Sequence, residues 1–260
     1  MSQRRPGFPA RLPSAVPQPS IARPALKLAG MQGSGVAAAP VGVGLDSAAV
    51  RARMVRRLSE SGITNSPVLS AMGMIERHRF VDSALVNQAY EDTSLPIGLG
   101  QTISKPSIVA RMAELLLGAP AVKTQGLGRV LEIGTGCGYQ AAVLGRIAKE
   151  VYTIERLRAL HEKARENLRP LRISNVHLIL GDGMLGYPKG APYAAIISAA
   201  GGENLPQQWC DQLAVGGRLV APMAGPGGKQ ILLVVDKTTA GLKQTILEAV
   251  NFVPLKSGIA

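Results

Sequence analysis

Aromatic residues are scarce in this sequence, and cysteine is nearly absent. Phe, Trp and Tyr together make up 3% of the 260 residues, which leaves few side chains on which nucleic-acid bases could stack. The two cysteines, Cys137 and Cys210, cannot form a disulfide framework, and the three scattered histidines add no zinc-ligand spacing. We therefore expect two small buried thiols, no metal site and a reducing compartment.

A long apolar run is also missing. No stretch approaches the roughly 18 consecutive apolar residues that cross a bilayer, and Gly, Pro or a charge interrupts the most apolar short runs. We therefore predict a soluble protein without a membrane partner. Hydrophobic residues make up 46% of the chain, which is enough to build a sizeable core in one domain, with or without an extension.

Acidic residues are absent from positions 1–45, which carry five basic residues and seven prolines. This segment shows no helical or alternating apolar period, so we predict a disordered Pro/Ala/Arg-rich extension. Its prolines argue against a signal peptide and against the amphipathic helix of a transit peptide. The whole chain carries a formal charge of +12, which favours anionic ligands or surfaces without specifying a fold.

Periodic apolar residues begin at Asp46, where the predicted domain starts. Helical spacing over residues 50–58 predicts a first helix that ends at Gly62, and a second helix is expected after Asn65. Residues 95–106, LPIGLGQTISKP, are rich in glycine and predict a loop. Helical spacing then returns at residues 108–117.

Beyond Gly128, short β-branched runs alternate with segments of helical spacing. The runs are RVLEIG (129–134), EVYTIE (150–155), VHLILGD (176–182), AAIISAA (194–200), GRLVAPM (217–223) and ILLVVD (231–236), and the helical segments are 139–148, 157–169 and 204–214. This alternation predicts an α/β fold, a doubly wound and mostly parallel sheet with helices on both faces.

The strongest local signal is VLEIGTGCGY at residues 130–139, a buried strand that runs into a glycine turn and then a helix. Glycine allows close backbone approach to a ligand, and the start of a helix presents free amide donors. We predict that Gly134, Thr135, Gly136 and Gly138 bind a cofactor, although a tight strand-to-helix connection without a ligand would use the same residues. The spacing is not the dinucleotide fingerprint, and the chain has no GxxxxGK[ST] phosphate loop.

Acidic residues stand near the ends of three predicted strands. Glu155 is placed to accept hydrogen bonds from ribose hydroxyls, and Asp182 with Gly183 is placed to meet an adenine. Glu132 suits an amino group or a sulfonium better than a phosphate. Each residue alone would more often be a solvated strand end or a helix cap. Together they favour S-adenosylmethionine over NAD or ATP.

Seven motifs in a fixed order resemble one known family. They are LPIGLGQTISKP, VLEIGTGCGYQAAVLG, VYTIE, NVHLILGDG, GAPYAAIISAA, GGRLVAPM and VNFVPL. Over about residues 46–256 the chain closely resembles the protein-L-isoaspartate (D-aspartate) O-methyltransferase family. The resemblance implies a Rossmann-like class I methyltransferase fold, with a helical cap and substrate loop at 46–128 and a cofactor-binding core at 129–260.

The resemblance also implies a function. Members transfer a methyl group from S-adenosylmethionine to the α-carboxylate of L-isoaspartyl residues in damaged proteins and peptides, which is a repair reaction. They are usually cytoplasmic and often monomeric, and we expect the same of this chain. A carboxylate is ionised at neutral pH and can attack the methyl group without a general base, so no His or Cys pair is required.

Ser104, in the TIS motif, matches the position treated as the family's active site. With Thr102 and Ile103, we assign it to binding and orienting the isoaspartyl carboxylate through its hydroxyl and nearby amides, and not to nucleophilic attack. Without the resemblance, a serine before Lys105 and Pro106 would be interpreted as an ordinary helix cap.

Five residues depart from the family's pattern, and one of them, Cys137 in place of a common Ser, is a conservative exchange in size. Lys105 replaces a neutral residue and places a cation near the expected substrate, Ala194 replaces an Asp at the amino end of a strand, and Ser198 and Ala199 replace Val and Thr. These changes motivate one alternative, a non-catalytic module that binds S-adenosylmethionine. The basic charge motivates a second, a nucleic-acid methyltransferase. Against it stand the scarce aromatics and the sequence SAAGG where an [ND]PP[YFW] motif is expected.

Overall fold

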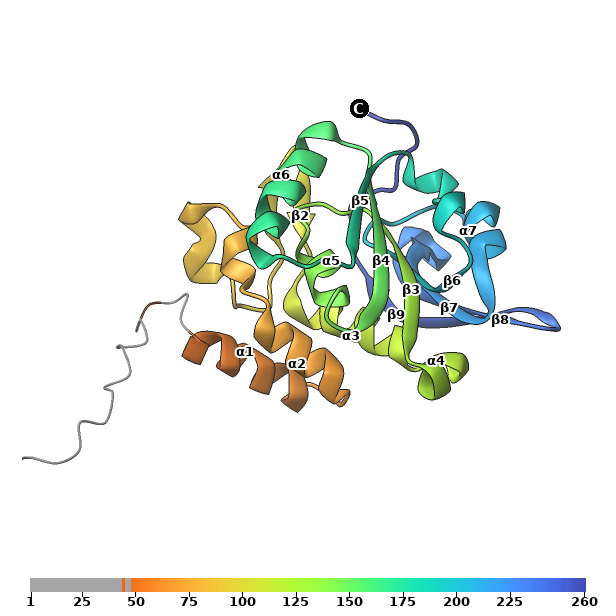
Figure 1. The fold of residues 1–260 in the computed structure, drawn as a ribbon, viewed down its shortest axis with the longest axis horizontal. Coiled ribbons are helices and arrows are strands. Elements are labelled where there is room, and N and C mark those ends of the chain that lie inside the picture. Colours follow the sequence, from red (N-terminus) through yellow and green to blue (C-terminus); the bar gives the residue numbers. More distant parts are fainter. Residues whose placement is uncertain (1–43, 45–47) are drawn as a thin grey trace, which may run out of the picture. The chain divides into compact units, whose positions relative to one another are not determined.

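The computed structural model describes Gly44 and residues 48–260 (Figure 1). Apart from Gly44, the predicted disordered extension at residues 1–45 lies outside the described residues. The predicted domain start at Asp46 lies outside them as well, so both expectations stay predictions.

A seven-stranded sheet forms the centre of the described fold, with the strand order β5-β4-β3-β6-β7-β8-β9 (Figure 1). Its strands are β3 (Leu127–Ile133), β4 (Ala148–Glu155), β5 (Val176–Leu180), β6 (Tyr193–Ser198), β7 (Leu213–Ala224), β8 (Gln230–Thr238) and β9 (Gly241–Val250). All pairs from β5 to β7 are parallel. The pairs β7–β8 and β8–β9 are antiparallel. The predicted mostly parallel sheet is confirmed.

Helices cover both faces of this sheet because its strands are apolar on both sides. The helices α3 (Pro106–Leu117), α4 (Pro120–Gln125), α5 (Tyr139–Leu144) and α6 (Arg158–Leu168) lie on one face, and α7 (Gln207–Gln212) lies on the other. Neighbouring residues of β3 show the alternation. Val130 packs in the cluster that contains Leu144 of α5. Leu131 packs in the cluster that contains Trp209 of α7.

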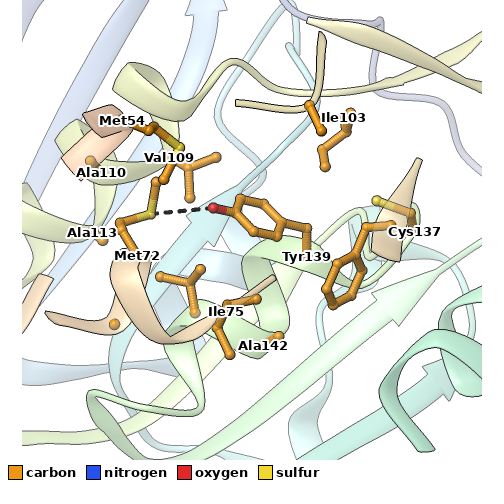
Figure 2. Packing of buried hydrophobic residues seen from close by; sticks show 14 of the residues in the cluster. Met54, Met72, Ile75, Ile103, Val109, Ala110, Ala113, Cys137, Tyr139 and Ala142 are labelled. Carbon is orange, nitrogen blue, oxygen red and sulfur yellow. Dashed lines mark hydrogen bonds between the residues drawn. The ribbon is translucent and has the colours of Figure 1, made fainter. Parts of the chain in front are cut away.

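The residues before the sheet form α1 (Ala48–Glu60), α2 (Ser66–Met74) and the 3-10 turns η1 (Arg77–Phe80) and η2 (Ser83–Gln88). Both predicted helices are confirmed. Asn65 caps α2 by accepting a hydrogen bond from the Val68 amide. The two helices pack against α3 and α5, and Figure 2 shows Met54 and Met72 beside Tyr139 of α5. Because Tyr139 directly follows the glycine turn, this packing holds that turn from behind.

The loop predicted at 95–106 is wrong in its first part. Residues Leu95–Gly98 (β1) and Gln101–Ile103 (β2) form an antiparallel hairpin. Leu95, Ile97 and Ile103 are buried beneath it, whereas the glycine-rich composition concealed these few alternating apolar positions. The hairpin is therefore anchored in the core at both of its strands.

Three other elements differ from the sequence-based expectation. Of the helical segment predicted at 204–214, only Gln207–Gln212 is helical, and β7 already begins at Leu213. The helical segment predicted at 139–148 ends at Leu144, and β4 already begins at Ala148. All six residues of α5 are buried, so this helix has no polar face to mark its length. Strand β9 was missed because most of its residues are exposed and show no apolar alternation.

Candidate functional site

The cleft that could bind a ligand lies where the strand order reverses. The chain passes from β3 to β4 on one side, whereas β6 pairs with β3 on the other, and such a switch point opens a crevice at the carboxyl ends of the strands. The cleft there holds about 870 Å³ of space, counting its open mouth. Its walls include residues 133–137, 154–157, 199–200, 101–104 and 253–256, together with Gly183.

Residues 134–137 of the glycine turn line this cleft, whereas Gly138 does not. Gly136 and Gly138 have φ angles of 56° and 91°, which favour glycine. A Cβ atom on Gly138 would also lie 3.1 Å from the side chain of Leu168 in α6. The amides of Gly134 and Thr135 donate to the carbonyl of Ile154 at 2.9 and 3.1 Å. These two hydrogen bonds fix the turn to β4.

Glu155, at the end of β4, faces the same cleft and is 5% exposed. Its Oε2 accepts a hydrogen bond from the Gly136 amide at 2.9 Å, and its Oε1 accepts one from the Leu157 amide at 2.9 Å. Each carboxylate oxygen keeps a further lone pair. Glu155 can therefore hold the turn in place and still accept hydrogen bonds from a ligand's hydroxyl groups.

Glu132 lies behind the turn and does not line the cleft. It is completely buried, and its Oε2 is 2.5 Å from the hydroxyl of Thr153, which in turn is 2.6 Å from that of Thr135. Burial raises the pKa of Glu132 to about 8, and the charge of Glu155 adds to this, whereas the hydrogen bond from Thr153 opposes it. At neutral pH the side chain is therefore mainly a protonated acid that supports Thr135 from below.

The raised pKa of Glu132 predicts a specific dependence of stability on pH. An unfolded Glu titrates near 4.5, so between about pH 4.5 and 8 the folded state holds a proton that the unfolded state has released. The free energy of unfolding therefore falls as pH rises through this window, and it levels off above it. The uncharged Glu132→Gln variant lacks this loss. Between pH 5 and pH 8 it should gain on the order of 2–4 kcal/mol relative to the wild type.

Urea unfolding of both proteins at several pH values measures this difference. Glu162→Gln, which alters an exposed residue of α6, serves as the matched control. Parallel stability curves for the wild type and Glu132→Gln would refute the protonated state.

Asp182 follows β5 and is engaged with the main chain. Its Oδ1 accepts a hydrogen bond from the Met184 amide at 2.9 Å, and its Oδ2 accepts one from the Gly258 amide at 2.7 Å. Asp182 itself does not line the cleft, whereas the adjacent Gly183 does. The structure thus brings Gly183 to the cleft, whereas the Asp182 side chain binds the main chain at Met184 and Gly258.

The last residues of the sequence form a wall that sequence reasoning missed. Residues 253–256 line the cleft. Beyond them, the amide of Ala260 donates to the Arg156 carbonyl at 2.9 Å, and the Arg158 amide donates to the Ala260 carbonyl at 2.9 Å. The segment therefore crosses the carboxyl ends of β5 and β4. The motif VNFVPL marked this region as distinctive, but no local pattern indicates where such a segment packs.

The predicted substrate residues Thr102, Ile103 and Ser104 all line the cleft, opposite the glycine turn. Ile103 is buried in the cluster around Tyr139 (Figure 2). The helix-cap interpretation of Ser104 is wrong, because the cap position of α3 is Lys105. The Ser104 hydroxyl makes no hydrogen bond to the part of the chain that the structure describes, and it is partly exposed. It is free to donate to a ligand.

Comparison with known proteins agrees with this arrangement. The family model described as Protein-L-isoaspartate(D-aspartate) O-methyltransferase matches residues 49–260. The chain belongs to this family. A Methylibium petroleiphilum protein named protein-L-isoaspartate O-methyltransferase is 55% identical over 253 residues, covering 96% of this chain and 92% of the relative. A Leptothrix cholodnii protein of the same name is 61% identical over 219 residues, covering 84% and 77%.

Solved structures support the fold as well. A protein-L-isoaspartate O-methyltransferase superposes with a TM-score of 0.72 at 29% identity, covering 80% of this chain and 67% of the other. A Plasmodium falciparum protein in complex with S-adenosyl-L-homocysteine, 24% identical, shares the fold with a TM-score of 0.68, covering 79% and 98%. The family assignment and the class I methyltransferase fold are confirmed. The chain is a protein repair methyltransferase that uses S-adenosylmethionine.

The departures from the family's pattern fall at different distances from the cleft. Ala199 lines it. Ser198 is buried and donates to the Ala200 carbonyl at 2.8 Å, and Ala194, in the first half of β6, does not reach the cleft. Lys105 is half-exposed beside a second pocket that adjoins Ser104. Their effects on methyl transfer stay predictions.

Both cysteines are buried free thiols, as expected. Among the described residues, no group of three or more His, Cys, Asp or Glu could hold a metal ion. In the same part of the chain, no helix is both long and apolar enough to cross a membrane.

Proposed function

We propose that the cleft at the switch point is the site of methyl transfer in this member of the family. S-adenosylmethionine would be held by the turn residues Gly134, Thr135 and Gly136 and by Glu155 and Gly183, with Gly138, Glu132 and Asp182 supporting these residues from outside the cleft. The substrate carboxylate would be held by Thr102, Ile103 and Ser104. The observation that carries this proposal is the free Ser104 hydroxyl in the same cleft as Glu155.

The residues present fit the cofactor. Glu155 keeps lone pairs for two ribose hydroxyls, because each of its oxygens accepts only one protein hydrogen bond. The Oε1 of Glu132 has no partner in the described chain and lies behind the turn. When bound, S-adenosylmethionine supplies an electrophilic methyl group on a sulfonium sulfur. No phosphate-binding residue is needed for such a ligand.

The protein's contribution to catalysis is positioning. The substrate carboxylate is ionised at neutral pH, so no side chain has to remove a proton from it. Ser104 donates a hydrogen bond to one carboxylate oxygen and directs the other toward the turn. The buried side chains of Ile103 and Ile97 limit water in the cleft. Alignment in such a site can supply a large part of the rate enhancement.

We propose isoaspartyl proteins and peptides as the partners, a monomer as the active form and the cytoplasm as the location. The family assignment supports all three, and the two reduced thiols are compatible with a reducing compartment. Nucleic acid is not proposed as a substrate, because SAAGG occupies the end of β6 where an amino-methylating enzyme carries [ND]PP[YFW].

The decisive experiment offers one synthetic peptide in two forms, with L-isoaspartate and with normal aspartate, and measures base-labile methyl ester from labelled S-adenosylmethionine. We expect label only in the isoaspartyl form. Ser104→Ala should lower kcat/KM by about 10- to 100-fold, since a hydrogen bond to a charged group contributes about 1.5–3 kcal/mol. Its affinity for S-adenosylhomocysteine should stay unchanged.

Ser70→Ala, an exposed serine on α2, is the matched control and should behave as the wild type. Label in neither peptide, with cofactor binding confirmed, would indicate a binding module. Salt-dependent methylation of RNA in place of the peptide would indicate a nucleic-acid enzyme.

A further inference from the structure

Helix α3, which begins two residues after Ser104, is not capped by its own sequence. The cap residue Lys105 makes no side-chain hydrogen bond to the helix. Asp92, from a loop 15 residues upstream of Ser107, supplies the missing acceptor. Its Oδ1 accepts from the Ser107 amide at 2.8 Å, and its Oδ2 accepts from the Ser107 hydroxyl at 2.8 Å. A carboxylate in the first turn of a helix is also favoured by the helix dipole.

The contact between Asp92 and Ser107 joins the two ends of the segment 93–106, which contains the proposed substrate residues. The hairpin β1–β2 and Ser104 all lie between these two residues. Within the described part of the chain, the hairpin accepts one side-chain hydrogen bond from another element, from Lys163 Nζ to the Ile97 carbonyl at 2.9 Å. That bond is made by the first strand of the hairpin. Ser104 follows the second strand and stands between the buried Ile103 and the start of α3, so its position depends on both.

The segment that carries Asp92 is itself fixed to the core. Arg77, which is fully buried, donates from Nε to the Ala89 carbonyl at 2.8 Å and from Nη2 to the Thr93 carbonyl at 3.3 Å. Its guanidinium lies 5.0 Å from the ring centre of Tyr139, directly after the glycine turn. Asp92 therefore lies between Ala89 and Thr93, whose carbonyls both bind Arg77. Arg77 in turn contacts Tyr139, beside the glycine turn.

The ion pair with Lys105 adds little to this arrangement. Lys105 Nζ lies 3.9 Å from Asp92 Oδ2, and both side chains are close to half-exposed. Exposed pairs of this kind contribute little to stability. The two short hydrogen bonds to Ser107 are the contacts that locate the start of α3, and they are charge-assisted.

We propose that Asp92 is a positioning residue for methyl transfer, which fixes the first turn of α3 and thereby sets Ser104 at the correct place in the cleft. This inference rests on the proposed role of Ser104. Asp92 does not line the cleft that holds Ser104 and Glu155, so it acts through the main chain and not on the substrate.

Asp92→Ala removes both acceptors, and Asp92→Asn is the conservative partner, because an amide can accept from the Ser107 amide and donate to the Ser107 hydroxyl. We expect Asp92→Ala to lower kcat/KM for the isoaspartyl peptide by about 10- to 100-fold, since small misplacements in an active site have effects of this size. Asp92→Asn should recover most of the activity. The Kd for S-adenosylhomocysteine should change less than twofold in both variants.

Asp82→Ala is the matched control. Asp82 also caps a turn, accepting from the Ala84 amide at 3.0 Å at the start of η2, and it lies outside the cleft. We expect it to lower the melting temperature as much as Asp92→Ala but to leave kcat/KM unchanged. Equal activity of the two alanine variants would overturn the proposal, and so would a parallel loss of cofactor affinity in Asp92→Ala.

A double-mutant cycle separates this inference from the proposed function. If Asp92 acts through Ser104, adding Asp92→Ala to Ser104→Ala should cost less than threefold further in kcat/KM. Full additivity would overturn the positioning role while leaving the role of Ser104 intact. A neutral Ser104→Ala would overturn both.

Discussion

Glu155→Ala is expected to weaken the binding of S-adenosylhomocysteine by about 100-fold or more. The substitution removes the acceptor of the amides of Gly136 and Leu157, two residues that line the cleft. It also removes the only carboxylate that lines the cleft in the described residues and could meet ribose hydroxyls. Hydrogen bonds to a charged group contribute about 1.5–3 kcal/mol each, and about 1.4 kcal/mol corresponds to a tenfold change in affinity.

Isothermal titration of the purified variant with S-adenosylhomocysteine measures this effect. Glu162→Ala, at an exposed position of α6, is the matched control and should bind as the wild type does. A Kd for Glu155→Ala within threefold of the wild-type value would show that Glu155 is a structural residue of the turn and not a cofactor ligand.

Trp209→Ala should have the largest effect on stability. Trp209 is fully buried in the cluster on the α7 face of the sheet, and its Nε1 donates to the Gly183 carbonyl at 2.8 Å. Truncation leaves a large cavity and an unpaired carbonyl, so the free energy of unfolding should fall by about 3–5 kcal/mol. Because Gly183 lines the cleft, affinity for the cofactor should fall as well.

Trp209→Phe separates the contribution of ring packing from that of the hydrogen bond to Gly183. It keeps most of the ring volume but loses the N–H donor, so we expect a loss nearer 1–2 kcal/mol from the hydrogen bond and imperfect packing. Urea unfolding of the three proteins measures both steps. A loss below 1 kcal/mol for Trp209→Ala would contradict the packing described above.

The order of strands and helices after Gly128 was predictable because each strand is apolar on both faces and each connection is polar or glycine-rich. The residues that break this rule were predicted poorly. Strand β9 is an exposed edge, and α5 is buried on every side, so neither shows the periodicity that marks a strand or an amphipathic helix. The β1–β2 hairpin was concealed by its glycines.

The candidate site also contains residues that the sequence predicted and one that it did not. The glycine turn and Glu155 lie next to strand ends, and parallel strands bring their carboxyl ends to one edge, so the sequence predicted their neighbourhood. The acid Asp92 was not predicted, since its partner Ser107 is separated from it by a hairpin. Long-range contacts of this kind leave no periodic trace.

The sequence by itself determined the family, the α/β class and the residue types at the cofactor turn, because these follow from local periodicity and from motifs of fixed spacing. Only the tertiary structure decided which residues share the cleft. It kept Glu132 and Asp182 out of the lining of the cleft, left the Ser104 hydroxyl free, and brought residues 253–256 over the strand ends. The physical reason is that burial and hydrogen-bond partners are set by packing between segments distant in sequence, which no local pattern encodes.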